Sequence, residues 1–227
     1  MIYNLLKIPA RLAFLIYCRY VKINGKKSLH LEGPLLICAN HPDSLLDAVI
    51  LSTLFKRPVH SLARGDAFKN KFYASLLRSI HMLPVYRVSE GVENLEQNYE
   101  TFDACKKIFK KGGIVLIFSE GRCINEWKLR PLMKGTARLA TSSWQEGIDL
   151  RILPVGINYH SFHSFGKNIQ LNFGEIFNKD SITREEGFGK AIISFNDKLR
   201  QELSKLVTEI KSDDKVTIRK KFYVQQP

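Results

Sequence analysis

Long apolar runs are missing from this sequence of 227 residues. The longest candidate covers residues 12–18 and lies between Arg11 and Arg19, whereas a helix that spans a bilayer needs about 20 consecutive apolar residues. A small-residue cleavage site after the apolar N-terminus is also missing, and basic residues run through that segment instead of preceding it. We therefore expect neither a transmembrane helix nor a signal peptide.

Cysteines are few and widely spaced. The four stand at positions 18, 38, 105 and 123, and no two are closer than 18 positions. This spacing excludes the short cysteine pairs of metal knuckles and redox motifs, so we expect the reduced thiols of a cytosolic protein. The histidines form no metal-ligand pattern either, because His160 and His163 lie in what reads as a loop. We expect no bound metal.

Acidic residues are in deficit. The chain has 35 lysines and arginines against 22 aspartates and glutamates, which gives a formal net charge of +13. Such a surplus favours an anionic partner, namely a nucleic acid, an acidic membrane surface or a phosphorylated small molecule. Neither zinc-finger spacing nor an aromatic-basic RNA-recognition signature is present, so we expect no nucleic-acid partner. With 44% hydrophobic residues, the chain is expected to fold as one domain.

The N-terminal segment, residues 2–20, has the pattern of an amphipathic helix. Its polar residues gather on one arc of the helix, and the wide opposite face is apolar. The first 31 residues hold six lysines and arginines and no acidic residue. These features favour a helix that lies in an anionic membrane interface, with Tyr3, Tyr17 and Tyr20 at headgroup depth. A helix that packs its apolar face on the protein core would show a similar pattern.

Downstream of residue 30, short apolar runs alternate with helix-like segments. This alternation predicts an α/β fold with a single domain and a mixed or mostly parallel sheet flanked by helices. We assign residues 1–30 to the membrane-interface segment, 31–212 to the folded domain and 213–227 to a polar tail. The expected strands are 34–38, 59–63, 82–86, 114–118, 152–158 and 169–173, and the expected helices are 44–55, 67–80, 92–111, 132–145 and one with an apolar stripe from Phe188 to Ile210.

Residues at the carboxyl ends of strands build the sites of such folds. The first segment that follows an expected strand in this way is Asn40 to Asp47, in which His41 comes directly after a buried strand. A histidine can act as a general base near neutral pH, and a carboxylate on its other ring nitrogen fixes its tautomer and orientation. Asp47 lies six positions after His41 and Asp43 competes with it for this contact, although Asp43 or Ser44 could also cap the following helix.

Further segments end in charged or glycine-containing turns. These strand ends and the stretch that follows them contain Arg87, then Glu120, Gly121 and Arg122, and finally Lys134. Arginine forks and lysine point charges at strand ends are suited to clamping a phosphate. Glycine allows a ligand to approach the backbone closely. A last segment at residues 152–156 reads on its own as ordinary core.

Taken together and in order, these segments resemble the glycerolipid acyltransferase family typified by 1-acylglycerol-3-phosphate acyltransferases. Lys134 resembles the lysine that follows the third block of that family, and residues 63–69 resemble the segment between the first two blocks. The resemblance covers about residues 34–160. The segments that resemble the four blocks are Asn40 to Asp47, Pro84 to Arg87, Phe118 to Arg122 and Leu153 to Val155.

The chain departs from the family pattern at two places. Five residues separate His41 from Asp47, where the usual first block has four, and this longer form resembles that of some bacterial and glycerol-3-phosphate-acylating relatives. This departure concerns the identity of the acceptor more than the family. Ser119 stands where the third block usually has proline, which alters the stiffness of the turn without removing Glu120.

The resemblance implies transfer of a fatty acyl group from acyl-coenzyme A or acyl carrier protein to a hydroxyl of lysophosphatidate, giving phosphatidate. The thioester is a co-substrate, and no further cofactor is expected. His41 would take the proton of the hydroxyl as that oxygen attacks the thioester carbonyl, and Asp47 would stabilise the imidazolium. No covalent acyl-enzyme is needed.

The other matched residues imply a substrate site. Arg87, Arg122 and Lys134 would hold the phosphate of the acceptor. Glu120 would order those cations or contact the glycerol, or else brace the turn through a salt bridge. Gly121 belongs to the same group of expected substrate-binding residues.

The resemblance also implies a place in the cell. We expect a peripheral or monotopic enzyme at the cytoplasmic face of a membrane, in a bacterium the inner membrane, with its oligomeric state open. Glycerol 3-phosphate, another lysophospholipid and a lyso-aminolipid are alternative acceptors for the same chemistry. A thioesterase and a non-catalytic lipid-binding protein are lesser alternatives.

Overall fold

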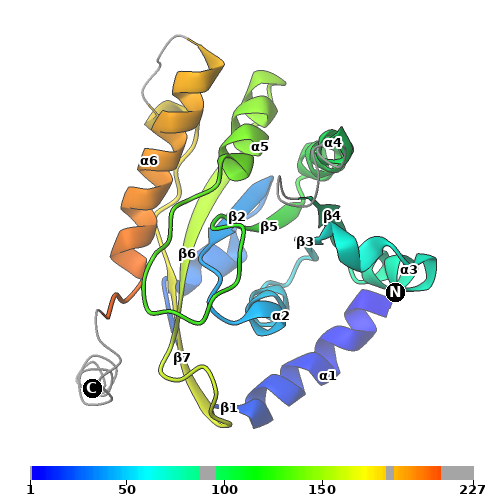
Figure 1. Cartoon of the computed structure of the whole chain (residues 1–227), viewed down its shortest axis with the longest axis vertical. Helices are drawn as coiled ribbons and strands as arrows, with labels where there is room; N and C mark the ends of the chain where they lie inside the picture. Colours follow the sequence, from blue (N-terminus) through cyan, green and yellow to red (C-terminus); the bar gives the residue numbers. More distant parts are fainter. Residues whose placement is uncertain (1, 87–95, 183–186, 211–227) are drawn as a thin grey trace.

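The computed structural model describes residues 2–86, 96–182 and 187–210. Within these residues the chain forms a seven-stranded sheet with the strand order β1-β7-β6-β2-β5-β3-β4 (Figure 1). The strands are β1 (Cys18–Asn24), β2 (Leu35–Ala39), β3 (Val59–Arg64), β4 (Met82–Val85), β5 (Ile114–Phe118), β6 (Arg151–Tyr159) and β7 (Lys167–Phe173). Neighbouring strands are parallel except β6 and β7. The predicted single α/β domain with a mostly parallel sheet is therefore confirmed.

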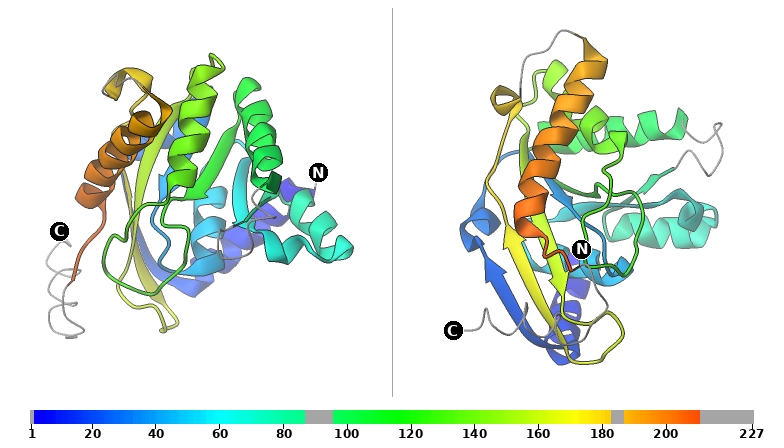
Figure 2. Two further views of the ribbon diagram at one scale, coloured as in Figure 1. Left: turned by 45° about the horizontal axis from the view of Figure 1, so that its top comes forward. Right: turned by 60° about the vertical axis from the view of Figure 1, so that its left-hand side comes forward.

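Helices cover both faces of the sheet (Figure 2). The faces are lined by α1 (Ile2–Tyr17) and α2 (Ser44–Leu54) on one side, and by α4 (Glu96–Lys110), α5 (Lys134–Gln145) and α6 (Phe188–Leu206) on the other. A further helix, α3 (Lys71–Ser79), lies beside the edge strand β4. This layering suits a parallel sheet, because the chain must cross one face of the sheet between consecutive parallel strands.

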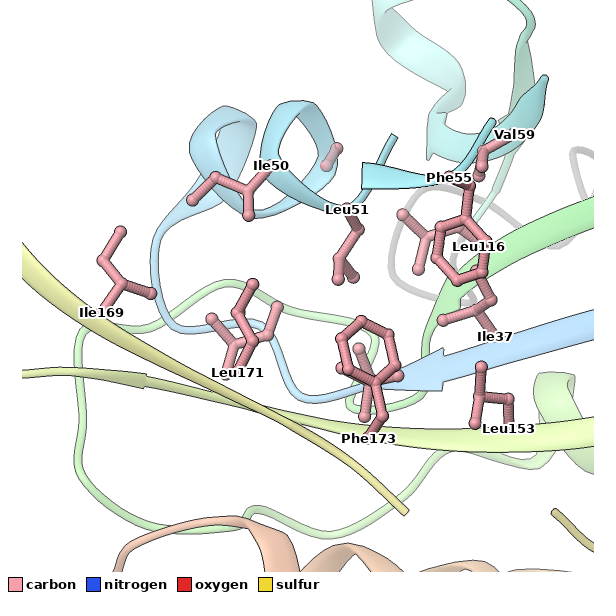
Figure 3. Packing of buried hydrophobic residues seen from close by; sticks show 14 of the residues in the cluster. Ile37, Ile50, Leu51, Phe55, Val59, Leu116, Leu153, Ile169, Leu171 and Phe173 are labelled. Carbon is pink, nitrogen blue, oxygen red and sulfur yellow. The ribbon is translucent and has the colours of Figure 1, made fainter. Parts of the chain in front are cut away.

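The central strands divide their side chains between two hydrophobic clusters. In β2, Leu35, Ile37 and Ala39 belong to the cluster with α2, whereas Leu36 and Cys38 belong to the cluster with α5 and α6. All five are fully buried, so β2 is apolar on both faces, as a central parallel strand requires. Figure 3 shows the first cluster, in which aliphatic side chains of α2 and the ring of Phe55 after it pack with side chains of β2, β5, β6 and β7.

The carboxyl ends of β2 and β5 meet at one edge of the sheet, beside the middle of β6. Ala39, the last residue of β2, is level with Phe118 of β5 and with Val155 of β6. The backbone N–H of Ser119 donates to the carbonyl of Ala39, so the loops after β2 and β5 start side by side. Loops that are far apart in the sequence are thereby brought together at this edge.

The N-terminal helix docks on the domain through a narrow stripe of side chains. Tyr3 donates to the carbonyl of Ser52, and the Lys7 ammonium donates to the carbonyl of Phe55. Tyr3 and Phe14 are buried. The alternative in which the whole apolar face packs on the core is wrong, because most of its aliphatic side chains are 45–74% exposed. These are Leu5, Leu6, Ile8, Leu12, Leu15 and Ile16.

β1 is a strand that the sequence pattern does not predict. The helix expected over residues 2–20 ends at Tyr17, and β1 pairs with β7 at the edge of the sheet. Gly25, with a φ of 75°, follows this strand in a left-handed conformation that favours glycine. The expected interface segment of residues 1–30 therefore supplies a strand to the sheet as well as a helix. Within the described residues, no helix has the length and apolarity that crossing a membrane requires.

Most of the other expected elements are present at nearly the expected bounds. The helix expected over 67–80 is divided into a 3-10 turn (Gly65–Phe68) and α3. The side chain of Asn70 accepts from two backbone N–H groups of the next turn, which makes it the N-cap of a new helix. The start of the helix expected over 92–111 and the tail expected over 213–227 lie outside the described residues.

Gly156 in β6 faces the end of α6 at a distance that admits no side chain. A Cβ atom at this position would lie 2.4 Å from the carbonyl oxygen of Leu206, which accepts from the side-chain amides of Asn158 and Asn172. We expect Gly156→Ala to lower the free energy of unfolding by about 3 kcal/mol, because β6 and the end of α6 must move apart although hydrogen bonds join them. Denaturant titration followed by circular dichroism measures this loss.

Gly189→Ala in α6 is the matched control. Nothing lies within 4 Å of the position that its Cβ would take, and alanine is a better helix former than glycine. We expect no loss of stability in this variant. Equal losses in the two variants would contradict the packing argument.

Candidate active site

The loop after β2 is held in place by its first residue, Asn40. The side-chain amide of Asn40 donates to the carbonyl of Ile157 at 2.9 Å, and its side-chain oxygen accepts from the N–H of Ile157 at 2.7 Å. A side chain thus continues the pairing of β2 with β6 beyond the last residue of β2. This clamp fixes the point at which the chain leaves the sheet, and the next residue is His41.

His41 contacts the first turn of α2 and the end of β5. Its Nδ1 is 2.9 Å from Oδ2 of Asp47, and the ring of Phe118 stacks on it with 3.7 Å between the ring centroids. The side chain is 17% exposed. Because an ionised carboxylate can only accept, we place the imidazole proton on Nδ1 and the lone pair on Nε2. This tautomer can accept a proton at Nε2.

Asp47 is a fully buried acid. Its Oδ2 also accepts from the backbone N–H of Asp43 at 2.8 Å, and its Oδ1 accepts from the hydroxyl of Tyr159 at 2.7 Å. Burial raises the pKa of Asp47 above its usual value, and the hydrogen bonds from His41, Asp43 and Tyr159 oppose that rise. Hydrogen bonds from the protein thus replace hydration as the support for a negative charge at this position.

Of the two aspartates that the sequence offers to His41, Asp47 makes the contact. The carboxylate of Asp43 forms an ion pair with the ammonium of Lys167, a side chain that is 2% exposed. The same ammonium donates to the carbonyl of Phe162. Asp43 therefore contributes its backbone N–H to the pair of His41 and Asp47, and its side chain is engaged elsewhere.

The fifth residue between His41 and Asp47 is accommodated by a strained turn. Ser44, the first residue of α2, has a φ of 39°, in a region that residues other than glycine rarely adopt. Its backbone N–H donates to the sulfur of Cys123 at 2.9 Å. With the chain turned in this way, the longer spacer still lets Asp47 face back to His41.

Glu120 braces the site from the loop after β5. It is 4% exposed, and its two carboxylate oxygens accept from the backbone N–H groups of His41 at 3.2 Å and of Arg130 at 2.9 Å. These contacts are with backbone amides, whereas the bracing role that the sequence offered as one alternative was a salt bridge. Contact of Glu120 with a substrate stays a prediction.

The rest of this loop, residues 119–133, lies against the loop of the histidine. The N–H of Ile124 donates to the carbonyl of His41 at 3.3 Å, and Figure 1 shows the long green loop passing the end of β2. Gly121 has a φ of 67°, and a Cβ there would lie 2.9 Å from the side chain of Met133. The turn itself therefore requires glycine, and a contact of Gly121 with a substrate stays a prediction.

The expected phosphate-binding residues are described in part. Arg122 is exposed in the loop after β5, and Lys134 is exposed as the first residue of α5. The start of α5 is anchored to this loop, because the N–H of Met133 donates to the carbonyl of Ser119 at 2.8 Å. Arg87 lies outside the described residues. Phosphate binding by these three cations stays a prediction.

Three side chains of the site were missed as functional candidates in the sequence: Phe118, Tyr159 and Lys167. Phe118 and Tyr159 each end a buried strand, so the strand-end rule that finds His41 applies to them as well. Lys167 is the first residue of β7, which runs antiparallel to β6 and brings its amino end to the site. Nothing in the local sequence marks this lysine.

Known proteins share both the sequence pattern and the fold. A 1-acyl-sn-glycerol-3-phosphate acyltransferase of Bacillus subtilis (strain 168) is 28% identical over 121 residues, which are 53% of this chain and 56% of that protein. The chain thus spans about half the length of this curated relative. The crystal structure of the 1-acyl-sn-glycerophosphate acyltransferase PlsC from Thermotoga maritima matches with a TM-score of 0.59 at 14% identity, over 90% of this chain and 79% of that one. This likeness shows a shared fold.

The family itself is shown by a match to the family model described as Acyltransferase, which covers residues 20–158. The matched range contains the loop of His41 and Asp47 and the loop of Glu120. Because the match extends over more than half of the sequence, the chain belongs to the acyltransferase family.

Proposed function

We propose that the chain transfers a fatty acyl group from an acyl thioester to the free hydroxyl of lysophosphatidate, which gives phosphatidate. The thioester is carried by coenzyme A or by acyl carrier protein. The observation that carries the proposal is the pair of His41 and Asp47, 2.9 Å apart at the carboxyl end of β2. Membership of the acyltransferase family and the printed name of the Bacillus subtilis relative support the reaction type and the acceptor.

In this mechanism His41 is the general base. Its Nε2 takes the proton of the acceptor hydroxyl as that oxygen attacks the thioester carbonyl, and Asp47 stabilises the imidazolium that forms. The tetrahedral intermediate then expels the thiolate, which takes the proton from His41. The products are an ester and a free thiol, and the acyl group is never attached to the protein.

The acceptor phosphate binds at the start of α5 in this proposal. The first turn of a helix has backbone N–H groups without partners in the helix, and its dipole favours an anion. Lys134 stands at this position, and Arg122 lies in the loop that leads to it. Because that loop also contacts His41, the phosphate and the general base would be held by the same segment. Arg87 is the third cation of this proposal.

α1 brings the enzyme to its lipid substrates as a peripheral contact with an anionic membrane, at the cytoplasmic face. Its aliphatic face is exposed, and Arg11 and Arg19 are exposed as well. Basic residues near an anionic surface contribute about 1 kcal/mol each, and aliphatic side chains add the free energy of leaving water. α3 offers further exposed apolar side chains, which are Phe72, Tyr73 and Leu76.

His41→Ala tests the proposed base. We expect kcat to fall by about 10²–10⁴-fold, the range of general-base catalysis. The kcat of Asp47→Asn should fall by a factor in the same range. The measurement is transfer of radiolabelled acyl groups from acyl-coenzyme A or acyl carrier protein to lysophosphatidate. His30→Ala, an exposed histidine in the turn after β1, is the control and should keep full activity.

The same assay, run in parallel with glycerol 3-phosphate and a lyso-aminolipid, tests the acceptor. If only one of these two compounds is acylated, the mechanism stands and that compound takes the place of lysophosphatidate as the acceptor. Free fatty acid formed without an acceptor would indicate a thioesterase. Absence of any product with either donor would contradict the proposed function.

Lys134→Ala tests the phosphate site. We expect the apparent KM for lysophosphatidate to rise about tenfold, because a hydrogen bond to a charged group contributes about 1.5 kcal/mol to binding. The KM for the thioester and kcat should change little in steady-state kinetics. Lys190→Ala removes an exposed cation from the first turn of α6 and should change neither KM. An unchanged acceptor KM in Lys134→Ala would refute this assignment.

Leu12→Glu combined with Ile16→Glu tests the membrane contact of α1. We expect binding to vesicles that contain phosphatidylglycerol to weaken more than tenfold in a flotation assay, because two apolar side chains no longer enter the lipid. Ile193→Glu replaces an apolar residue of α6 that is 59% exposed and should bind as the unchanged protein does. Equal flotation of all three proteins would exclude α1 as the contact.

A further inference from the structure

The β6–β7 hairpin brings two polar side chains to the site that the matched motifs do not include. Tyr159, the last residue of β6, is fully buried, and Lys167, the first residue of β7, is 2% exposed. The Lys167 ammonium lies 5.2 Å from the centre of the Tyr159 ring. Each side chain contacts one aspartate, since Tyr159 donates to Asp47 and Lys167 pairs with Asp43.

These contacts restrict both carboxylates that the loop could offer to the imidazole. The Tyr159 hydroxyl holds Oδ1 of Asp47 at 2.7 Å, which leaves Oδ2 to His41 and to a backbone N–H. The ion pair with Lys167 holds the side chain of Asp43. The partner of the histidine therefore depends on residues more than a hundred positions away in the sequence.

We propose that Tyr159 and Lys167 are positioning residues, which ensure that Asp47 and not Asp43 is the carboxylate partner of His41. Tyr159 acts through Asp47 and Lys167 acts through Asp43, so neither needs to touch a substrate. The kinetic consequences of this proposal rest on the proposed function of the site.

Tyr159 also influences the charge of Asp47. A carboxylate that loses one of three donors is less stable as an anion, and its pKa rises. A protonated Asp47 cannot stabilise the imidazolium, so loss of the hydroxyl lowers the active fraction of the enzyme at acidic pH. Burial and the charge of Asp47 raise the pKa of Tyr159 far above its usual value, which keeps the phenol a donor throughout the working range.

Other titratable groups surround this network, and they come from the loops after β2 and β5 and from β1 and β7. They are His41, Asp43, Glu120, Cys123, Cys18 and Lys167. Burial raises the pKa of Cys18 to about 11 and also raises the pKa of Cys123, so the thiols do not titrate at acidic pH. The thiols therefore do not contribute to the acidic limb of a pH profile.

Tyr159→Phe tests the proposal, because it removes the hydroxyl and keeps the ring. We expect kcat to fall about ten- to hundredfold with the KM of each substrate unchanged, since a hydrogen bond to a charged group is lost from the catalytic pair alone. The acidic limb of the kcat–pH profile should move up by about one pH unit. Unchanged kcat and an unmoved acidic limb would overturn the proposal.

Tyr3→Phe is the matched control. Like Tyr159→Phe, it removes a buried hydroxyl, but this hydroxyl belongs to α1, away from the site. Its hydrogen-bond partners are the carbonyl of Ser52 and the N–H of Val59. We expect a comparable loss of thermal stability with kcat and the pH profile unchanged. If Tyr3→Phe changes kcat and the profile as Tyr159→Phe does, the effect is one of stability and the proposal is overturned.

Lys167→Met tests the second half of the proposal. It frees the carboxylate of Asp43, so we expect a loss of kcat that Asp43→Asn restores in the double variant, because the competing anion is then gone. Failure of the double variant to recover while remaining folded by circular dichroism would overturn the role of Lys167. If the single variant does not fold, comparison of the folded double variant with the unchanged enzyme decides the same point.

The proton on Nδ1 of His41 gives a readout that needs no turnover. We assign its resonance in the ¹H NMR spectrum by its loss in His41→Ala, and we expect it to shift in Tyr159→Phe and to stay in Tyr3→Phe. A resonance that does not respond to Tyr159→Phe would overturn the positioning role. A shifted resonance in an enzyme that acylates no acceptor would support this role and count against the proposed function alone.

Discussion

A carboxylate without contact to solvent must receive hydrogen bonds from the protein if it is to carry a charge, and much of the site is arranged to satisfy this requirement at Asp47. Its three donors are an imidazole, a backbone amide and a phenol. They come from the loop after β2 and from the end of β6, so this loop must follow β6 beyond the last residue of β2. The register places Ala39 level with Val155, and the side chain of Asn40 extends the pairing to Ile157.

The charged residues of the site divide by burial. Asp47 faces the imidazole ring, Glu120 faces backbone amides of two loops, and Lys167 neutralises a neighbouring carboxylate. Each of these three groups is nearly or fully buried and has its partners within the protein. Arg122 and Lys134, in contrast, are exposed. Buried charges thus shape the loops, and exposed cations at the same edge of the sheet are placed where an anionic ligand can reach them.

Much of the fold follows from local pattern, whereas part of the site does not. Apolar runs and helical periodicity predict the buried strands and the helices between them, because burial on both faces of a parallel sheet leaves a continuous apolar signal. β1 escapes prediction, since its exposed edge residues read as a continuation of the preceding helix. The partner of His41 cannot be read from spacing, because Asp43 is held by Lys167, 124 positions away, and Asp47 by Tyr159, 112 positions away. The roles of Arg87 and the other substrate residues stay predictions.

The order of the strands also determines when the site can form. In the described sheet, the pairs β3–β4 and β6–β7 consist of strands that follow each other in the chain, whereas β1, β2 and β5 pair only with strands that are not adjacent to them in the chain. Formation of such a sheet depends on contacts between residues that are distant in the sequence, and proteins rich in such contacts fold slowly. During synthesis α1 leaves the ribosome before β6 and β7, which carry the phenol that completes the shell of Asp47 and the lysine that holds Asp43. A nascent chain therefore presents its aliphatic helix long before its histidine can acquire a fixed partner.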